Sequence, residues 1–161
     1  MAELIEVKQV EQNALSVIQN MVTSGNFDVS VARELLEMQK DFMRQQAIIN
    51  FNNDFSLMSK EIPIIAKSKR AHNTSYAPLE DIVKITQPIL SKYGFSVSFS
   101  TSQNGLESVT VQCTLMHRDG HSTSTELMLP TKSVSNSMNA MQAIGAAITY
   151  AKRYTISGIL N

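Results

Sequence analysis

The side chains best suited to binding chemistry lie close to the C-terminal end, in a segment whose pattern predicts a helix from Asn139 to about Tyr154. Small residues there would let another chain approach the backbone closely, Thr, Lys and Arg supply hydrogen-bond donors, and Tyr rings can stack on bases. The candidates share a stripe away from the apolar one or flank it: Gln142, Thr149, Tyr150, Lys152, Arg153 and Tyr154. We expect a surface that follows a phosphate backbone. The alternative is a docked helix whose basic C-terminal turn complements the helix dipole.

A second basic and aromatic group lies between residues 62 and 77. The pattern predicts a strand over residues 62–66 that runs into a basic turn and returns at residues 75–77. Lys67 and Lys69 would alternate onto one face, where both could point at a phosphate backbone, with Arg70 and Tyr76 beside them. The alternative is a charged hairpin edge that prevents aggregation.

The sequence gives little support for catalytic chemistry. Cys113, His117 and His121 recur every four residues, but a zinc site needs a third or fourth converging ligand, and the turn at Asp119-Gly120 places the histidines across from each other. The sequence contains no Walker-type phosphate loop, no nucleophile elbow and no HExxH motif. We therefore expect no catalytic residue, no metal, no cofactor and no enzyme.

Two helices are expected before these groups. Residues 3–23 predict the first, and Asp28 or Ser30 is placed to cap a second that runs to about Lys60. The second has two apolar stripes, which lie roughly opposite each other. The stripes consist of Val31, Leu35, Met38, Phe42 and Ile49, and of Ile48, Phe51, Phe55 and Met58. Either this helix covers two surfaces, one of them on a neighbouring subunit, or it kinks near residues 45–47 around one core.

Downstream, the pattern predicts an α+β core. Pro78 stands at the start of an amphipathic helix that Gly94 ends, with Pro88 inside it. Alternating apolar residues then predict three antiparallel strands, joined by turns at Asn104-Gly105 and Asp119-Gly120. This β-meander and the hairpin need helices over their apolar side. A polar loop over 131–139 precedes the last helix, which Ser137 could cap and whose buried stripe includes Met141.

The composition describes a folded, neutral chain. Its 161 residues carry 14 basic and 14 acidic side chains, 43% are hydrophobic, and no apolar run could span a membrane. A single cysteine and an acidic N-terminus without a signal peptide favour the reducing cytoplasm. Residues 1–61 sum to −4, and residues 62–161 to +4. This asymmetry suggests an anionic ligand on the second part or head-to-tail self-association, although an ordinary solvated surface would also produce it.

From residue 51 onward the sequence resembles the ERF (essential recombination function) family. The order and spacing of several short segments carry the resemblance: Pro63–Ile65, Tyr76–Ile82, Pro88–Leu90, Tyr93–Phe95, Leu115–His121, Leu129–Pro130 and Gln142–Tyr154. The resemblance implies a phage-type recombination protein of the host bacterial cytoplasm. Such a protein binds single-stranded DNA and anneals complementary strands through a duplex intermediate, without ATP, as an oligomeric ring or filament. Its core would resemble the annealing domain of the eukaryotic Rad recombination mediators.

The change of pattern at residue 62 divides the chain into a helical arm, 1–61, which we expect to contact another subunit, and a core, 62–161, to which the resemblance assigns the annealing activity. Within that core, Lys152 and Arg153 would be the main phosphate contacts, opposite a wall of Lys67, Lys69 and Arg70. Gln142, Thr149 and the loop 131–139 would add neutral contacts, and the three tyrosines would stack on bases or pack in the core. A host single-strand-binding protein could be a partner, and a C-terminal part could be missing. The alternatives are an assembly scaffold without annealing activity and, less favoured, a hydrolase.

Overall fold

The computed structural model describes residues 16–25, 28–71, 74–105, 107–131 and 139–160. The chain divides into two compact units, Met1–Ile49 and Asn50–Asn161. Of the helix expected over residues 3–23, the described part, 16–23, is helical, and the remainder lies outside the described residues. Among the helices that the structure describes, none is long and apolar enough to cross a membrane.

Helix α2, Val29–Glu61, runs without interruption through the region where a kink was one possibility. Asp28 caps its start as expected, because its carboxylate accepts hydrogen bonds from the backbone N–H and the hydroxyl of Ser30 at 2.8 and 2.6 Å. The two apolar stripes have different surroundings. Phe51 and Met58 of the second stripe are buried, whereas Phe42 of the first stripe is exposed. The interpretation of one core around a kinked helix is therefore wrong.

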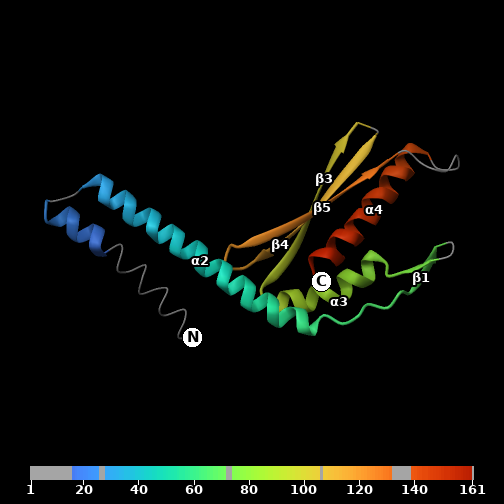
Figure 1. Cartoon of the computed structure of the whole chain (residues 1–161), viewed down its shortest axis with the longest axis horizontal. Coiled ribbons are helices and arrows are strands. Elements are labelled where there is room, and N and C mark those ends of the chain that lie inside the picture. Colours follow the sequence, from blue (N-terminus) through green and yellow to red (C-terminus); the bar gives the residue numbers. More distant parts are fainter. Residues whose placement is uncertain (1–15, 26–27, 72–73, 106, 132–138, 161) are drawn as a thin grey trace. The chain divides into compact units, whose positions relative to one another are not determined.

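The central element of the second unit is the expected three-stranded antiparallel meander (Figure 1). It consists of β3, Phe95–Asn104, β4, Ser108–His117, and β5, Ser122–Pro130, in that spatial order. Cys113 pairs with Phe99 on one side and with Thr125 on the other. The strict alternation in β4 buries every second side chain, so one face of the sheet is apolar and the other is rich in Ser and Thr.

Two helices cover the apolar face of this sheet. Helix α3, Leu79–Lys92, contacts β3, and helix α4, Ala140–Ile159, contacts β4 and β5. Leu115 of β4 joins a core cluster with Phe51 and Ile156, while Val111 packs with Ala151. The α+β class is thus confirmed. Pro78 is the residue before α3 rather than its first helical residue.

The hairpin is shorter than the sequence predicted. It consists of β1, Lys69–Ala71, and β2, Thr74–Tyr76, and residues 62–68 belong to no strand. Pro63 has no N–H to donate to a ladder, and Ile62 and Ile65 pack against the core instead. The strand expected over 62–66 is therefore wrong, and so is the reasoning that Lys67 and Lys69 alternate on one strand.

Helix α4 begins and ends later than expected. Asn139 caps it: its side chain accepts from the N–H of Gln142 at 2.8 Å, and the side chain of Gln142 accepts from the N–H of Asn139 at 3.2 Å. This capping box replaces Ser137, which lies outside the described residues, as do residues 132–138 of the expected loop. Met141 is 80% exposed, so its place in the buried stripe was wrong.

Candidate nucleic-acid interface

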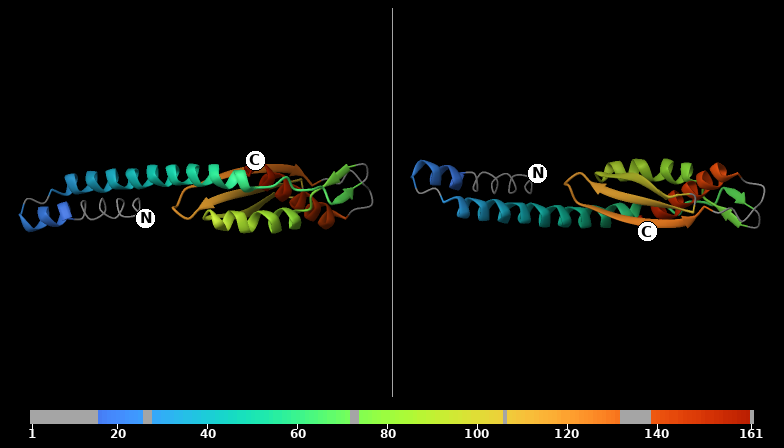
Figure 2. Two further views of the ribbon diagram at one scale, coloured as in Figure 1. Left: turned by 90° about the horizontal axis from the view of Figure 1, so that it is seen from below. Right: turned by 90° about the horizontal axis from the view of Figure 1, so that it is seen from above.

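Helix α4 and the β1–β2 hairpin meet at Arg153. The guanidinium carbon of Arg153 lies 4.4 Å from the ring centre of Tyr76, within the range of a cation–π contact. Figure 2 shows the hairpin beside α4 in two views. Two groups that lie far apart in the sequence therefore form one surface.

Two further tyrosines of α4 complete this surface. Tyr150 and Tyr154, one helical turn apart, stack with ring centres at 4.3 Å and an interplanar angle of 26°. Arg153 lies 5.2 and 5.3 Å from their ring centres. Both rings remain about half exposed, so they are not core residues. We call Tyr76, Tyr150, Arg153 and Tyr154 the arginine–tyrosine cluster.

The two stacked phenols differ in acidity. The interaction between the two phenol side chains raises the pKa of Tyr150 and lowers the pKa of Tyr154. The positive charges of Arg153 and Lys67 lower the pKa of Tyr154 further. Lys67, although outside any strand, is therefore close enough to act on the cluster.

The side chains of the remaining cations, Lys69, Arg70 and Lys152, point in different directions. Lys69 is directly opposite Tyr76 in the hairpin register, so their side chains share one face, while Arg70 is opposite Ser75 on the other. The ammonium group of Lys152 lies 5.4 Å from the ring centre of Phe99 of β3. Lys152 thus extends from α4 toward the sheet, and Arg153 extends toward the hairpin.

These cations are available to a ligand. Within the described part of the chain, none of the following forms a salt bridge: Lys67, Lys69, Arg70, Lys152 and Arg153. Lys40, Arg44, Lys92 and Arg118 each pair with a carboxylate, whereas Arg33, Lys60 and Lys84 form no salt bridge among the described residues either. Unpaired cations beside exposed aromatic rings can bind an anionic backbone while the rings stack on bases.

The position of the cations within α4 excludes one alternative. The helix continues to Ile159, and its last turn carries no basic residue. Lys152 and Arg153 therefore lie too far from the C-terminus to complement the helix dipole, whose effect is confined to the last turn.

The two neutral candidates have structural roles inside α4. Gln142 belongs to the capping box, and the hydroxyl of Thr149 donates to the carbonyl of Gly145 at 2.9 Å. Both side chains are exposed. Their remaining hydrogen-bonding capacity faces solvent, but the described contacts do not join them to the cluster.

Cys113 and His117 of β4, and His121 in the turn after it, pack against neighbouring side chains of the fold. The fully buried side chain of His117 contacts the carboxylate of Asp54 at 3.0 Å, and His121 packs edge-on against Phe51 at 4.8 Å. Burial raises the pKa of the Cys113 thiol to about 11, which disfavours the reactive thiolate. No group of metal-ligating side chains occurs among the described residues.

Sequence reasoning missed two positions, Phe99 beneath Lys152 and Asp54 beside His117. The alternation of β3 does place Phe99 on the inner face, but no local pattern links it to α4. His117 lies on β4 and its partner Asp54 on α2, so spacing along the sequence could not identify the pair.

A comparison with known protein families covers the hairpin and α4 in a single match. The model of the ERF superfamily matches residues 51–161, which include both strands of the hairpin and all of α4. No curated protein and no solved structure matches the chain.

Proposed function

Because this chain belongs to the ERF superfamily, a family of recombination proteins, we propose that it binds single-stranded DNA and anneals complementary strands without ATP, as an oligomer. The observation that carries the proposal is the contact between Arg153 and Tyr76, since it joins the unpaired cations of α4 and the hairpin into one surface.

Annealing makes two demands on a binding site. The site must hold the sugar–phosphate backbone of one strand, and it must leave the base edges free to pair with a complement. Cations contact phosphates without reading sequence, and tyrosine rings contact base faces rather than edges. Arg153 and the exposed rings of Tyr150 and Tyr154 offer both kinds of contact at one place.

In this proposal the chain is not an enzyme and needs no cofactor or metal, because strand pairing itself provides the driving force. Lys152 and Arg153 contact phosphates from α4, and Lys67, Lys69 and Arg70 contact them from the hairpin side. Stacking on Tyr150 and Tyr154 orders one or two bases. The cellular setting of the proposal is phage recombination in a bacterial cytoplasm, where a host single-strand-binding protein is a partner.

The experiment compares the annealing of two complementary labelled oligonucleotides with and without the protein, in buffer that lacks ATP. We expect acceleration by the wild type and its loss in the double variant Lys152→Ala, Arg153→Ala. The double variant Lys40→Ala, Arg44→Ala removes the same charge from α2 and should retain activity. If the wild type pairs the strands no faster than they pair alone, the proposal fails.

A second candidate function is an assembly scaffold, which the exposed apolar residues of α2 favour. Electron microscopy with and without single-stranded DNA distinguishes the two. Assemblies whose form depends on DNA support the annealing proposal, and assemblies that are indifferent to DNA support the scaffold.

A further inference from the structure

Helix α2 carries an apolar stripe that the described chain leaves uncovered. Val31, Met38, Phe42 and Ile49 are between 37 and 68% exposed, although they lie on one side of the helix. With half-buried Leu35 they follow the spacing i, i+4, i+7, i+11, i+18. A stripe from residue 31 to residue 49 is about 27 Å long at 1.5 Å per residue. Such spacing is typical of a helix that places its apolar side in a groove.

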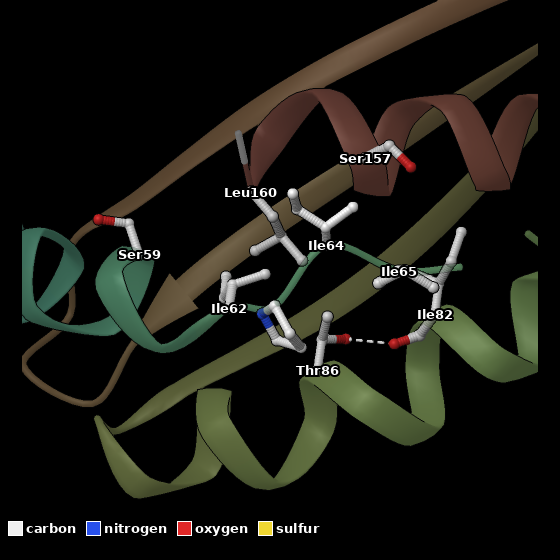
Figure 3. Close-up of a pocket in the computed structure, with 9 residues that line it drawn as sticks. Ser59, Ile62, Ile64, Ile65, Ile82, Thr86, Ser157 and Leu160 are labelled. Atoms are coloured by element: carbon white, nitrogen blue, oxygen red, sulfur yellow. Dashed lines mark hydrogen bonds between the residues drawn. The ribbon is translucent and has the colours of Figure 1, made fainter. Parts of the chain in front are cut away.

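The second compact unit contains a groove of about 340 Å³, lined by apolar side chains and by Ser59, Thr86 and Ser157. The segment after α2 forms its centre, between α3 and the end of α4, as Figure 3 shows. Its apolar lining comes from Ile62, Pro63, Ile64, Ile65, Ile82 and Leu160. The side chain of Ile64 is fully exposed in the chain. Ile64 therefore offers a fully exposed apolar side chain to a partner, beside the half-buried side chains of Ile62 and Ile65.

The charges of the two units favour a contact between the first unit of one copy and the second unit of another copy. Residues 1–49 contain seven acidic and four basic side chains, and residues 50–161 contain seven acidic and ten basic ones. The units therefore carry −3 and +3. Two stripes that faced each other would bring two acidic units together, which opposes binding. A stripe that docks on the groove of another copy brings opposite charges together.

We infer that the α2 stripe of one copy docks in the Ile64 groove of a second copy. The inference rests on the oligomeric part of the proposed function and specifies its interface. The two surfaces differ, so the contact is head-to-tail: each copy offers one stripe and one groove. A contact of this kind repeats until the copies close into a ring or extend as a filament.

The experiment uses one variant for each surface and a matched control. Phe42→Asp places a charge in the stripe, and Ile64→Asp places one in the groove. Met43→Asp is the control, because Met43 is adjacent to Phe42, is 45% exposed against 46%, and lies about 100° around the helix. Masses are measured by light scattering, and circular dichroism checks that each variant is folded. Should Ile64→Asp not fold, Ile64→Gln replaces it.

We expect oligomers for the wild type and for Met43→Asp, and monomers of 17.8 kDa for the two interface variants. An equal mixture of the interface variants should form a heterodimer and nothing larger, because one intact stripe and one intact groove remain. The inference is overturned if either interface variant stays fully oligomeric or if the mixture stays monomeric. An oligomer lost only in Phe42→Asp overturns it too, because it indicates stripe-to-stripe pairing.

Binding of a labelled oligonucleotide, measured on the same samples, separates this inference from the proposed function. Retained DNA binding together with unchanged oligomers refutes the interface alone. Absence of DNA binding in the wild type refutes the proposed function, whatever the masses.

Discussion

Removal of Lys152 and Arg153 should lower the salt dependence of DNA binding by a definite amount. Both residues are half-buried and lack a carboxylate partner among the described residues, so we assign one phosphate contact to each. Each contact to a single strand contributes about 0.7 to the slope of log K against log salt concentration. The double variant Lys152→Ala, Arg153→Ala should therefore have a slope smaller by about 1.4.

This change of slope has a direct consequence for affinity. Between about 50 and 200 mM salt, the ratio of wild-type to variant affinity should shrink by roughly sevenfold. Fluorescence anisotropy of a labelled oligo-dT at several salt concentrations measures both slopes. The variant Lys40→Ala, Arg44→Ala should keep the wild-type slope, because its two cations are already paired on α2. Equal slopes for the wild type and the Lys152, Arg153 variant would refute the assignment of phosphate contacts to α4.

Three further predictions concern the surroundings of the site. Because the side chain of Tyr150 lowers the pKa of Tyr154, the phenolate of Tyr154 forms at a lower pH than that of an ordinary tyrosine and repels phosphate; DNA affinity, measured by anisotropy, should fall through that pH range in the wild type and not in Tyr154→Phe. Asp54→Ala removes the carboxylate that lies 3.0 Å from buried His117 and 3.1 Å from Arg118, and it should lower the free energy of unfolding by about 1–3 kcal/mol in urea, with DNA affinity unchanged. Gly94→Ala should cost about 1–2 kcal/mol in the same assay, because φ is +76° and the new Cβ would lie 2.6 Å from a side-chain carbon of Arg118.

The meander could be predicted from sequence because its signal is local. The alternation in β4 and the turns at Gly105 and Gly120 indicate the strands. The register was less predictable: Asn104 pairs with Ser108, so the first connection has three residues, whereas an Asn-Gly turn predicts two. The apolar run at 62–65 carries a weaker signal, since β-branched residues suit both a strand and an extended segment packed on helices. Pro63 was the residue that argued against a strand.

The ends of α4 illustrate a choice between competing local signals. Ser137 and Asn139 are both good N-cap residues, but only Asn139 has a Gln three positions later, which completes the capping box. At the other end, buried Ile156 and Ile159 continue the helical spacing beyond Tyr154. Both signals were present in the sequence.

The site itself was predictable in its residue types but not in its geometry. The contact of Arg153 with Tyr76 joins residues far apart in the chain, and no periodicity encodes it. The divergence of Lys152 toward Phe99 likewise depends on how α4 packs on the sheet.

The central claim is that single-stranded DNA binds at the arginine–tyrosine cluster, and tyrosine fluorescence tests it most directly. The chain has four tyrosines and no tryptophan. The variant Tyr93→Phe removes the tyrosine that hydrogen-bonds Glu61, so that the remaining emission comes only from the cluster. Titration with unlabelled oligo-dT should quench most of this emission as the bases stack on the rings. Emission that stays constant up to saturation, established by anisotropy of a labelled strand, would contradict the account.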